Sequence, residues 1–184
     1  IDDSEPLTED LGANASDAEG KGVLMSAILG KGADSRPLTR GALKNATTIS
    51  MKRVDDISSA TFCESVEAAH SAHGDQAQIA SKLGITKPSV RMDSQAKYAS
   101  IARGAGDIYL RLPVKKDYQE KIWDHAAGDL IVREAGGEVT DSQGKQLDFS
   151  VGRTLKNNKG VVAAPKAIHG KVLEAVTSVL SAKQ

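Results

Sequence analysis

The chain has 184 residues, of which 40% are hydrophobic, and this suffices to bury one full core or one core and part of a second. Basic and acidic residues number 24 each, so no global field draws the chain to nucleic acid or to a membrane surface. The single cysteine, Cys63, excludes an internal disulfide and suits a reducing compartment. No apolar run approaches membrane-spanning length and no signal peptide is visible, so we expect a cytoplasmic or nuclear protein.

The first part of the chain predicts a loop followed by a strand hairpin. Residues 1–20 are rich in Asp, Glu, Ser, Asn and Gly, which is typical of a loop. The apolar run at residues 22–29 ends in Gly-Lys-Gly at residues 30–32, which predicts a strand and a tight turn. A phosphate-binding loop would need a following helix, and none is indicated. A further strand is expected over Thr47–Met51.

Residues 61–63 read as a buried strand, and a helix ended by Gly84 is expected after it. His70 and His73 lie three residues apart, a spacing that can place two ligands on one metal ion. No cysteine or third histidine stands near to complete a zinc site, so surface histidines are the simpler interpretation.

The stretch from Asp93 to Ala102 predicts another helix, with Asp93 or Ser94 as its N-cap. Ser94 and Lys97 then place a hydroxyl, free amides and an ammonium group on one side, an arrangement that suits a phosphate. A capped helix with a solvated lysine fits the same spacing, and spacing alone favours it.

Residues 107–112 alternate in the manner of a strand, with Tyr109 and Arg111 on one face. The opposite face carries Ile108, Leu110 and Leu112. An arginine near the end of an apolar strand either pairs with a carboxylate or is aimed at an anion.

The stretch from Trp123 to Gly137 predicts a helix capped by Asp124 and stopped by Gly136-Gly137. The acidic cap at the positive end of the helix dipole could hold a divalent cation, while the amides hold a phosphate. An ordinary capped core helix fits the same residues, and the physics of the stretch alone favours it.

The rest of the chain predicts short strands over residues 138–141 and 146–149, a buried strand over 160–164 and a last helix from Pro165. Strands and helices alternate from residue 60 onward. The pattern therefore predicts an α/β fold with helices packed on a mixed β-sheet.

The motif Trp123-Asp-x-Ala-Ala-Gly128, followed by Glu134-Ala-Gly-Gly137 and Asp141, resembles the C-terminal signature of the inositol monophosphatase superfamily. These are metal-dependent, lithium-sensitive phosphomonoesterases. Further stretches resemble the eukaryotic 3'(2'),5'-bisphosphate nucleotidases of that superfamily, a group linked to sulfate assimilation: Val66-Glu67 with His70, residues 93–98, residues 107–113 and residues 118–122. The match covers most of residues 60–165, and it weakens before residue 20 and in the last helix.

This resemblance implies a layered α+β architecture of the inositol monophosphatase and sugar phosphatase type. Residues 1–52 would be the end of an N-terminal metal-binding domain, kept as a loop and strand hairpin. Residues 53–184 would be the C-terminal nucleotide-binding domain. Because the chain begins at Ile1 without a methionine, we expect a C-terminal fragment whose partner is the missing N-terminal domain.

The same resemblance implies the site residues. Substrate would be held by a set of side chains that comprises His70, Ser94, Lys97, Arg111 and Asp124. Asp124 would also be a ligand of the Mg²⁺ cofactor. The family takes its other ligands from a glutamate and from an Asp-Pro-x-Asp-Gly-Thr loop, which this chain lacks. The chain by itself is therefore expected to have little or no activity.

The implied reaction of the intact protein is removal of the 3'-phosphate of adenosine 3',5'-bisphosphate to give AMP and phosphate, with 3'-phosphoadenylyl sulfate as a second substrate. Two alternatives stay open, an inositol phosphate phosphatase of the same superfamily and a non-catalytic binding or antigenic fragment. A Ser-His-Asp hydrolase built from Ser94, His70 and Asp124 has the residue types but lacks the glycine pattern of a nucleophile elbow.

Overall fold

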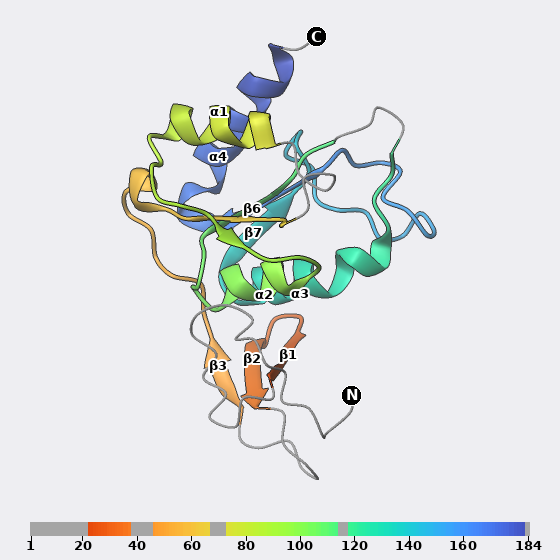
Figure 1. Cartoon of the computed structure of the whole chain (residues 1–184). Helices are drawn as coiled ribbons and strands as arrows, with labels where there is room; N and C mark the ends of the chain where they lie inside the picture. Colours follow the sequence, from red (N-terminus) through yellow and green to blue (C-terminus); the bar gives the residue numbers. More distant parts are fainter. Residues whose placement is uncertain (1–21, 38–45, 67–72, 114–117, 183–184) are drawn as a thin grey trace.

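A computed structural model describes residues 22–37, 46–66, 73–113 and 118–182 of the chain (Figure 1). The strands are β1 (Val23–Ile28), β2 (Gly32–Pro37), β3 (Thr47–Ile49), β4 (Phe62–Glu64), β5 (Val90–Arg91), β6 (Ile108–Arg111), β7 (Gly137–Thr140) and β8 (Val161–Pro165). The helices are α1 (His73–Leu83), α2 (Ala96–Ala102), α3 (Ala126–Glu134) and α4 (Lys166–Ser181), with short 3-10 turns η1 (Ile57–Ser59) and η3 (Ile122–Asp124). Within these ranges, no helix combines the length and apolar character needed to cross a bilayer.

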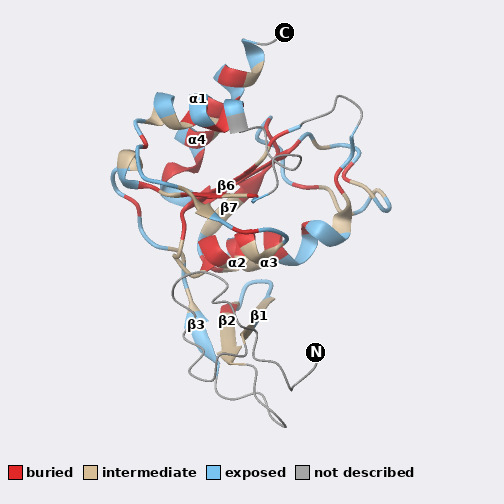
Figure 2. Ribbon diagram, viewed as in Figure 1, coloured by how far each residue is buried: buried red, intermediate tan, exposed pale blue. Residues whose placement is uncertain are grey.

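The larger sheet is mixed and runs in the order β5-β4-β6-β8-β7. Strand β4 pairs in parallel with β5 and β6, whereas β8 pairs antiparallel with β6 and β7. Helices α1 and α4 lie on one face of this sheet, and α2 and α3 lie on the other (Figure 1). Figure 2 shows that the middle of the sheet and the helix faces turned toward it are buried, whereas the edge strand β5 is partly exposed. The predicted arrangement of helices on a mixed sheet is confirmed.

Strand β6 separates the two hydrophobic cores because its alternate side chains point to opposite faces. Ile108 and Leu110 lie in the core that α1 and α4 cover. Tyr109 lies in the core that α2 and α3 cover. The predicted alternation of residues 107–112 is therefore confirmed, and it places Arg111 on the side of α2 and α3, at the end of the strand.

The smaller sheet is antiparallel, in the order β1-β2-β3, and its hairpin turn is tied to α3. Gly30 and Gly32 have positive φ angles of 74° and 87°, which glycine adopts without steric cost. Their N–H groups donate to the two carboxylate oxygens of Glu134 at 2.9 and 2.8 Å. The predicted turn is confirmed, and its amides bind a side chain of the same protein.

The helix predicted to follow an Asp124 cap begins one residue later than expected. Asp124 is the last residue of η3, and α3 starts at Ala126 with His125 in the N-cap position and no side-chain cap. The predicted capping role of Asp124 is therefore wrong, because the 3-10 turn ends before α3 and leaves this carboxylate exposed. The other end of the helix agrees with the prediction, since Gly136 adopts a φ of 93°.

The strand predicted over residues 146–149 is not formed. The side chain of Asn158 satisfies this backbone in place of a neighbouring strand, with its Oδ1 accepting from Asp148 N at 2.8 Å and its Nδ2 donating to Gln146 O at 2.9 Å. Leu147 is buried, so the apolar signal that suggested a strand reflects burial of a loop.

His169 on α4 is buried against the sheet and is expected to make stability depend on pH. Its Nε2 lies 3.1 Å from Thr140 Oγ1 and 3.3 Å from Val162 O. The Thr140 hydroxyl donates to Asp141 O, so His169 Nε2 carries the hydrogen in this pair. Burial lowers the pKa of His169 below its ordinary value of 6.5, although Glu138 opposes the shift.

The unfolded chain therefore takes up this proton at a higher pH than the folded chain does. The stabilising contribution is complete above pH 6.5 and is lost as the pH falls through the lowered pKa. We expect urea unfolding to show a free energy that decreases between about pH 7 and pH 5, and the His169→Gln variant to show a flatter profile. Equal pH slopes for the two proteins would contradict this assignment.

Candidate active site

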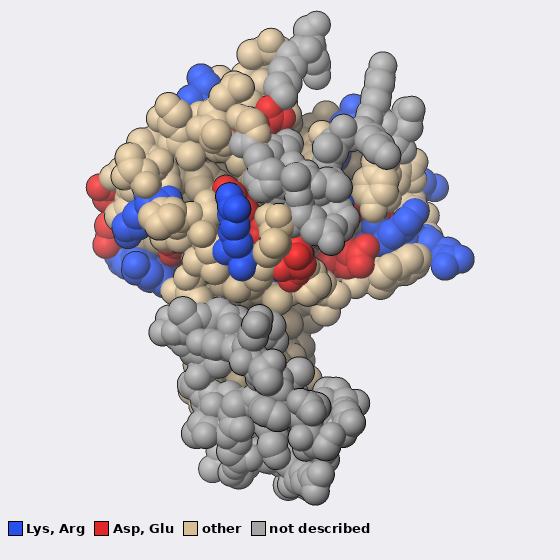
Figure 3. Space-filling model, viewed as in Figure 1, with Lys and Arg blue, Asp and Glu red and all other residues tan. Residues whose placement is uncertain are grey.

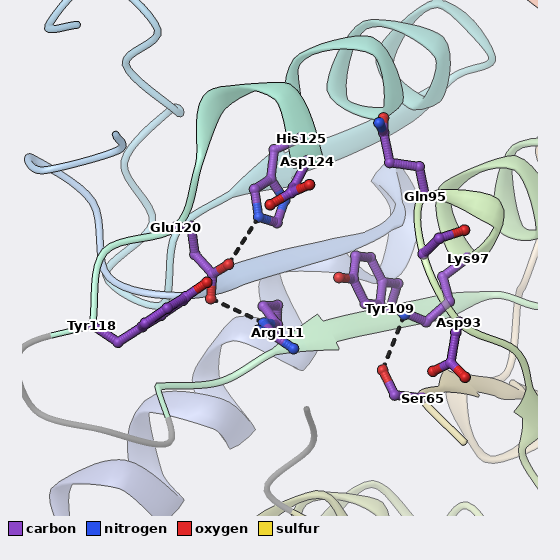
Figure 4. Close-up of a pocket in the computed structure, with 11 residues that line it drawn as sticks. Ser65, Asp93, Gln95, Lys97, Tyr109, Arg111, Tyr118, Glu120, Asp124 and His125 are labelled. Atoms are coloured by element: carbon purple, nitrogen blue, oxygen red, sulfur yellow. Dashed lines mark hydrogen bonds and ion pairs between the residues drawn. The ribbon is translucent and has the colours of Figure 1, made fainter. Parts of the chain in front are cut away.

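One pocket of about 520 Å³ opens where β6, the start of α2 and the segment before α3 meet. Its lining is mostly polar or charged and comprises Ser65, Asp93, Ser94, Gln95, Lys97, Tyr109, Arg111, Tyr118, Glu120, Asp124 and His125 (Figure 4). Four of the five predicted site residues therefore line one pocket: Ser94, Lys97, Arg111 and Asp124. The fifth, His70, lies outside the described residues.

Charges of both signs share the face of the molecule shown in Figure 3. This agrees with the balance of 24 basic and 24 acidic residues. An anion bound in the pocket would thus be held by the local placement of a few side chains, because the chain as a whole carries no net charge.

Lys97 is buried in the pocket wall, which differs from the solvated lysine that spacing alone favoured. Its Nζ donates to Ser65 Oγ at 3.0 Å and lies 5.3 Å from the centre of the Tyr109 ring. Burial lowers the pKa of Lys97, while Asp93 opposes that shift. A bound anion would favour the charged ammonium and offset part of the cost of its desolvation.

Arg111 ends β6 and is held from one side by a carboxylate. Its Nε donates to Glu120 Oε1 at 2.9 Å, and both side chains are largely buried. Of the two alternatives for this arginine, pairing with a carboxylate is observed. Contact with an anion remains compatible with it, because a guanidinium carries five N–H donors.

Ser94 precedes α2 and does not occupy its N-cap position. The N-cap residue is Gln95, which makes no side-chain cap, and Ser94 itself has a positive φ of 60°. Its hydroxyl accepts from Ala96 N at 3.3 Å, so it still satisfies one amide of the first turn. Asp93 is not the cap either, because its carboxylate accepts from Val66 N at 3.1 Å. Ser94 lines the pocket with this unusual backbone conformation.

A line of hydrogen bonds runs through the wall of the pocket from Tyr98 to Arg111. Tyr98 OH lies 2.8 Å from His125 Nδ1, and His125 Nε2 lies 3.2 Å from Glu120 Oε2. Burial would raise the pKa of Glu120, but the hydrogen bonds from His125 and Arg111 outweigh it and lower that pKa. Glu120 is therefore a carboxylate at neutral pH, and it accepts from both partners.

The fit of a metal ion rests on Asp124. This carboxylate is exposed and lines the pocket, as a metal ligand should. The other nearby carboxylates, Glu120 and Asp93, are already engaged by donors of the protein. Residues 22–37, 46–66, 73–113 and 118–182 contain no cluster of three or more His, Cys, Asp or Glu side chains suited to a metal. The described part thus supplies one candidate ligand and no complete metal site.

Sequence reasoning assigned no role to three side chains of this site, the pocket-lining Glu120 and His125 and the buried Tyr98. Two of these lie within motifs already noted, at residues 93–98 and 118–122, and His125 is the variable position of the Trp-Asp-x-Ala-Ala-Gly motif. The available signal was an acidic residue and a histidine five positions apart, beside a strand that ends in arginine. That spacing does not show which side chains become their hydrogen-bond partners.

The model for the inositol monophosphatase family matches residues 12–181. The chain belongs to the inositol monophosphatase family. Within it, the chain is similar to proteins named 3'(2'),5'-bisphosphate nucleotidase. It is 66% identical over 180 residues to that of Emericella nidulans, which covers 98% of this chain and 51% of the relative. It is 49% identical over 188 residues to that of Schizosaccharomyces pombe, which covers 98% of this chain and 53% of the relative. The chain thus spans about half the length of these curated relatives.

Solved structures agree on the fold. The inositol monophosphatase from Anabaena (Nostoc) sp. has a TM-score of 0.63 at 19% identity, and the match covers 85% of this chain and 57% of that one. The extragenic suppressor protein suhB from Bartonella henselae has a TM-score of 0.62 at 22% identity. These likenesses confirm the predicted architecture of the inositol monophosphatase type.

Proposed function

We propose that the chain forms the nucleotide-binding part of a Mg²⁺-dependent 3'(2'),5'-bisphosphate nucleotidase. The reaction would convert adenosine 3',5'-bisphosphate to AMP and phosphate, with 3'-phosphoadenylyl sulfate as a second substrate. The names of relatives that are 66% and 49% identical support this assignment. The observation that carries it is the meeting of Lys97, Arg111 and Asp124 in one pocket.

The chemistry of the substrate fits these groups. A nucleoside bisphosphate carries two phosphates, and the pocket offers two cationic side chains on different elements, Lys97 on α2 and Arg111 on β6. The ammonium acts as a compact charge, whereas the guanidinium can bind two phosphoryl oxygens at once. Ser94 adds a hydroxyl at the pocket mouth. His70 keeps its proposed role in substrate binding.

Members of this family generally depend on metal ions. Mg²⁺ is the ion that we propose, with Asp124 as one ligand and the other ligands supplied by an N-terminal domain outside this chain. When bound, Mg²⁺ would neutralise phosphoryl charge and activate a water molecule. The residues of this chain would bind and orient the nucleotide. We also propose that residues 1–52 belong to the metal-binding domain.

Isothermal titration of the chain with adenosine 3',5'-bisphosphate tests the proposal. We expect weak binding that is unchanged by Mg²⁺, and at least a tenfold loss of affinity in Arg111→Ala, because a guanidinium–phosphate contact is a strong charge-assisted hydrogen bond. Arg53→Ala is the matched control, since Arg53 pairs with Asp55 on the surface and does not line the pocket.

Two outcomes would contradict the proposal. Failure of the unaltered chain to bind the nucleotide would mean that the pocket is not a preformed nucleotide site. Binding of inositol 1-phosphate as tightly as the nucleotide would favour the inositol phosphate alternative. A separate measurement tests the expected inactivity of the chain by itself. Full Mg²⁺-dependent turnover would contradict that expectation and would exclude a purely non-catalytic fragment.

A further inference from the structure

One hydrogen-bonded network, which we call the Glu120 network, runs through the wall of the pocket and comprises Arg111, Glu120, His125 and Tyr98. Of the predicted site residues, Arg111 is the one that belongs to it. Asp124 directly precedes His125, and Lys97 directly precedes Tyr98. Figure 4 shows Glu120 between Arg111 and His125, with dashed lines to both. The network therefore links β6, the segment before α3, and α2.

Three members of the network have almost no exposed surface. Tyr98 is 1% exposed, His125 2% and Glu120 9%. The Tyr98 ring stands edge-on to Tyr109, with centroids 4.8 Å apart, and also edge-on to His125. A buried donor or acceptor that loses its partner costs more than the bond itself contributes. Each member thus constrains the orientation of the next.

The direction of each hydrogen bond follows from the charge of Glu120. A carboxylate only accepts, so Arg111 Nε–H and His125 Nε2–H must both donate to it. In a neutral imidazole, His125 Nδ1 is then an acceptor, and the Tyr98 hydroxyl donates to it. This tautomer gives each of the three hydrogen bonds one donor and one acceptor. The other tautomer would face a nitrogen lone pair toward the carboxylate.

We propose that Glu120 is a positioning residue of the nucleotide site, which holds Arg111 for phosphate contact and sets the Nε2–H tautomer of His125. This inference rests on the proposed function for its ligand. Its structural part can be tested without any ligand. Of the two cationic side chains in the pocket, Glu120 contacts Arg111, and the network reaches Tyr98, the residue after Lys97, only through His125.

The decisive variant is Glu120→Gln, which keeps the shape and removes the charge. The amide oxygen can still accept from Arg111 Nε, but the amide NH₂ then faces His125 Nε2. His125 must move its hydrogen to Nδ1, and Tyr98 must accept, which leaves the buried tyrosine hydrogen without a partner. The surface carboxylate Glu174 on α4 provides the matched control, Glu174→Gln.

The test is nitrogen-15 NMR of the histidine rings in the full 184-residue chain, which has four histidines. The His125 signal is assigned by its loss in His125→Asn. We expect the Nε2–H tautomer in the unaltered chain and in Glu174→Gln, and the Nδ1–H tautomer or a mixture in Glu120→Gln. The ring signal of His169, which lies in the opposite core, reports whether each variant is folded.

An Nδ1–H tautomer in the unaltered chain, or an unchanged His125 signal in folded Glu120→Gln, would overturn the proposal. Titration with adenosine 3',5'-bisphosphate adds the functional arm, in which Glu120→Gln should bind at least tenfold more weakly than Glu174→Gln. If Glu120→Gln and the unaltered chain bind equally well, the positioning role is wrong while the proposed function stands. If neither binds, the proposed function is wrong, and the ring signal still decides the structural part.

Discussion

Replacing Asp141 by alanine is expected to lower the free energy of unfolding by about 3 to 5 kcal/mol. Asp141 is 0% exposed and its carboxylate accepts four hydrogen bonds. Oδ1 accepts from Gln143 N at 2.8 Å and Lys145 N at 2.9 Å. Oδ2 accepts from Asn158 Nδ2 at 3.2 Å and Lys159 N at 3.3 Å. The carboxylate thereby joins the turn after β7 to the segment that enters β8, and its loss leaves these donors without an acceptor.

Urea unfolding of the two proteins measures this difference. Asp148→Ala is the matched control, because Asp148 lies in the same loop and accepts from Ser150 and Asn157 near the surface, where water can replace it. We expect that control to cost about 1 kcal/mol or less. Asp141→Asn should fall between the two, since its amide NH₂ would face the donors of Asn158 and Lys159. Equal losses of unfolding free energy for Asp141→Ala and Asp148→Ala would show that the buried carboxylate of Asp141 contributes no more stability than the partly exposed one of Asp148.

The elements that sequence reasoning placed correctly are those whose pattern is set by burial along the chain itself. Strand β6 has strict alternation because each of its faces meets a different core. The turn at Gly30 and Gly32 and the helix end at Gly136 were predictable because glycine tolerates positive φ. In each case, the information needed lies within a few residues of the element.

The parts that were not predictable depend on which side chains meet across elements. Lys97 reads as a surface residue, yet it is buried because Ser65 and the Tyr109 ring receive its ammonium group. The sequence predicts Asp124 as a helix cap, yet this residue ends the 3-10 turn η3 and its side chain lines the pocket. Spacing shows neither outcome, because the deciding partners come from β4, β6 and the segment before α3.

The family resemblance named four residues that line one pocket, but it did not name the side chains that hold them in place. The resemblance identified Lys97 and Arg111, whose residue types themselves suit phosphate. Glu120 carries no such signal, because an acidic residue in a polar stretch is most often a surface residue. Its role follows only from burial and from the two donors that it accepts. Candidate site residues can thus be named from the sequence, whereas the hydrogen-bonded network that holds them becomes visible only in the structure.

Gly128→Ala tests the contact on which that network depends. A Cβ at Gly128 in α3 would lie 2.4 Å from two ring carbons of Tyr98 and 2.8 Å from its Cβ. Such a clash forces α3 or the tyrosine to move, and we expect a loss of about 2 to 3 kcal/mol in the free energy of unfolding. Because Tyr98 donates to His125, the His125 ring signal should also change, and nucleotide binding should weaken.

The same substitution at Gly170 should have the opposite sign. Gly170 lies within α4 and has no atom within 4 Å of an added Cβ, so alanine there gains helix propensity without a clash. We expect Gly170→Ala to stabilise the chain by about 0.5 to 1 kcal/mol and to leave the His125 signal unchanged. Thermal or urea unfolding of both variants separates the steric clash from the helix propensity. Propensity alone predicts that alanine stabilises the chain at both glycines, whereas the clash predicts a loss of stability at Gly128. A stabilised Gly128→Ala would mean that α2 and α3 are not in close contact, and the Glu120 network would then lose its support at Tyr98.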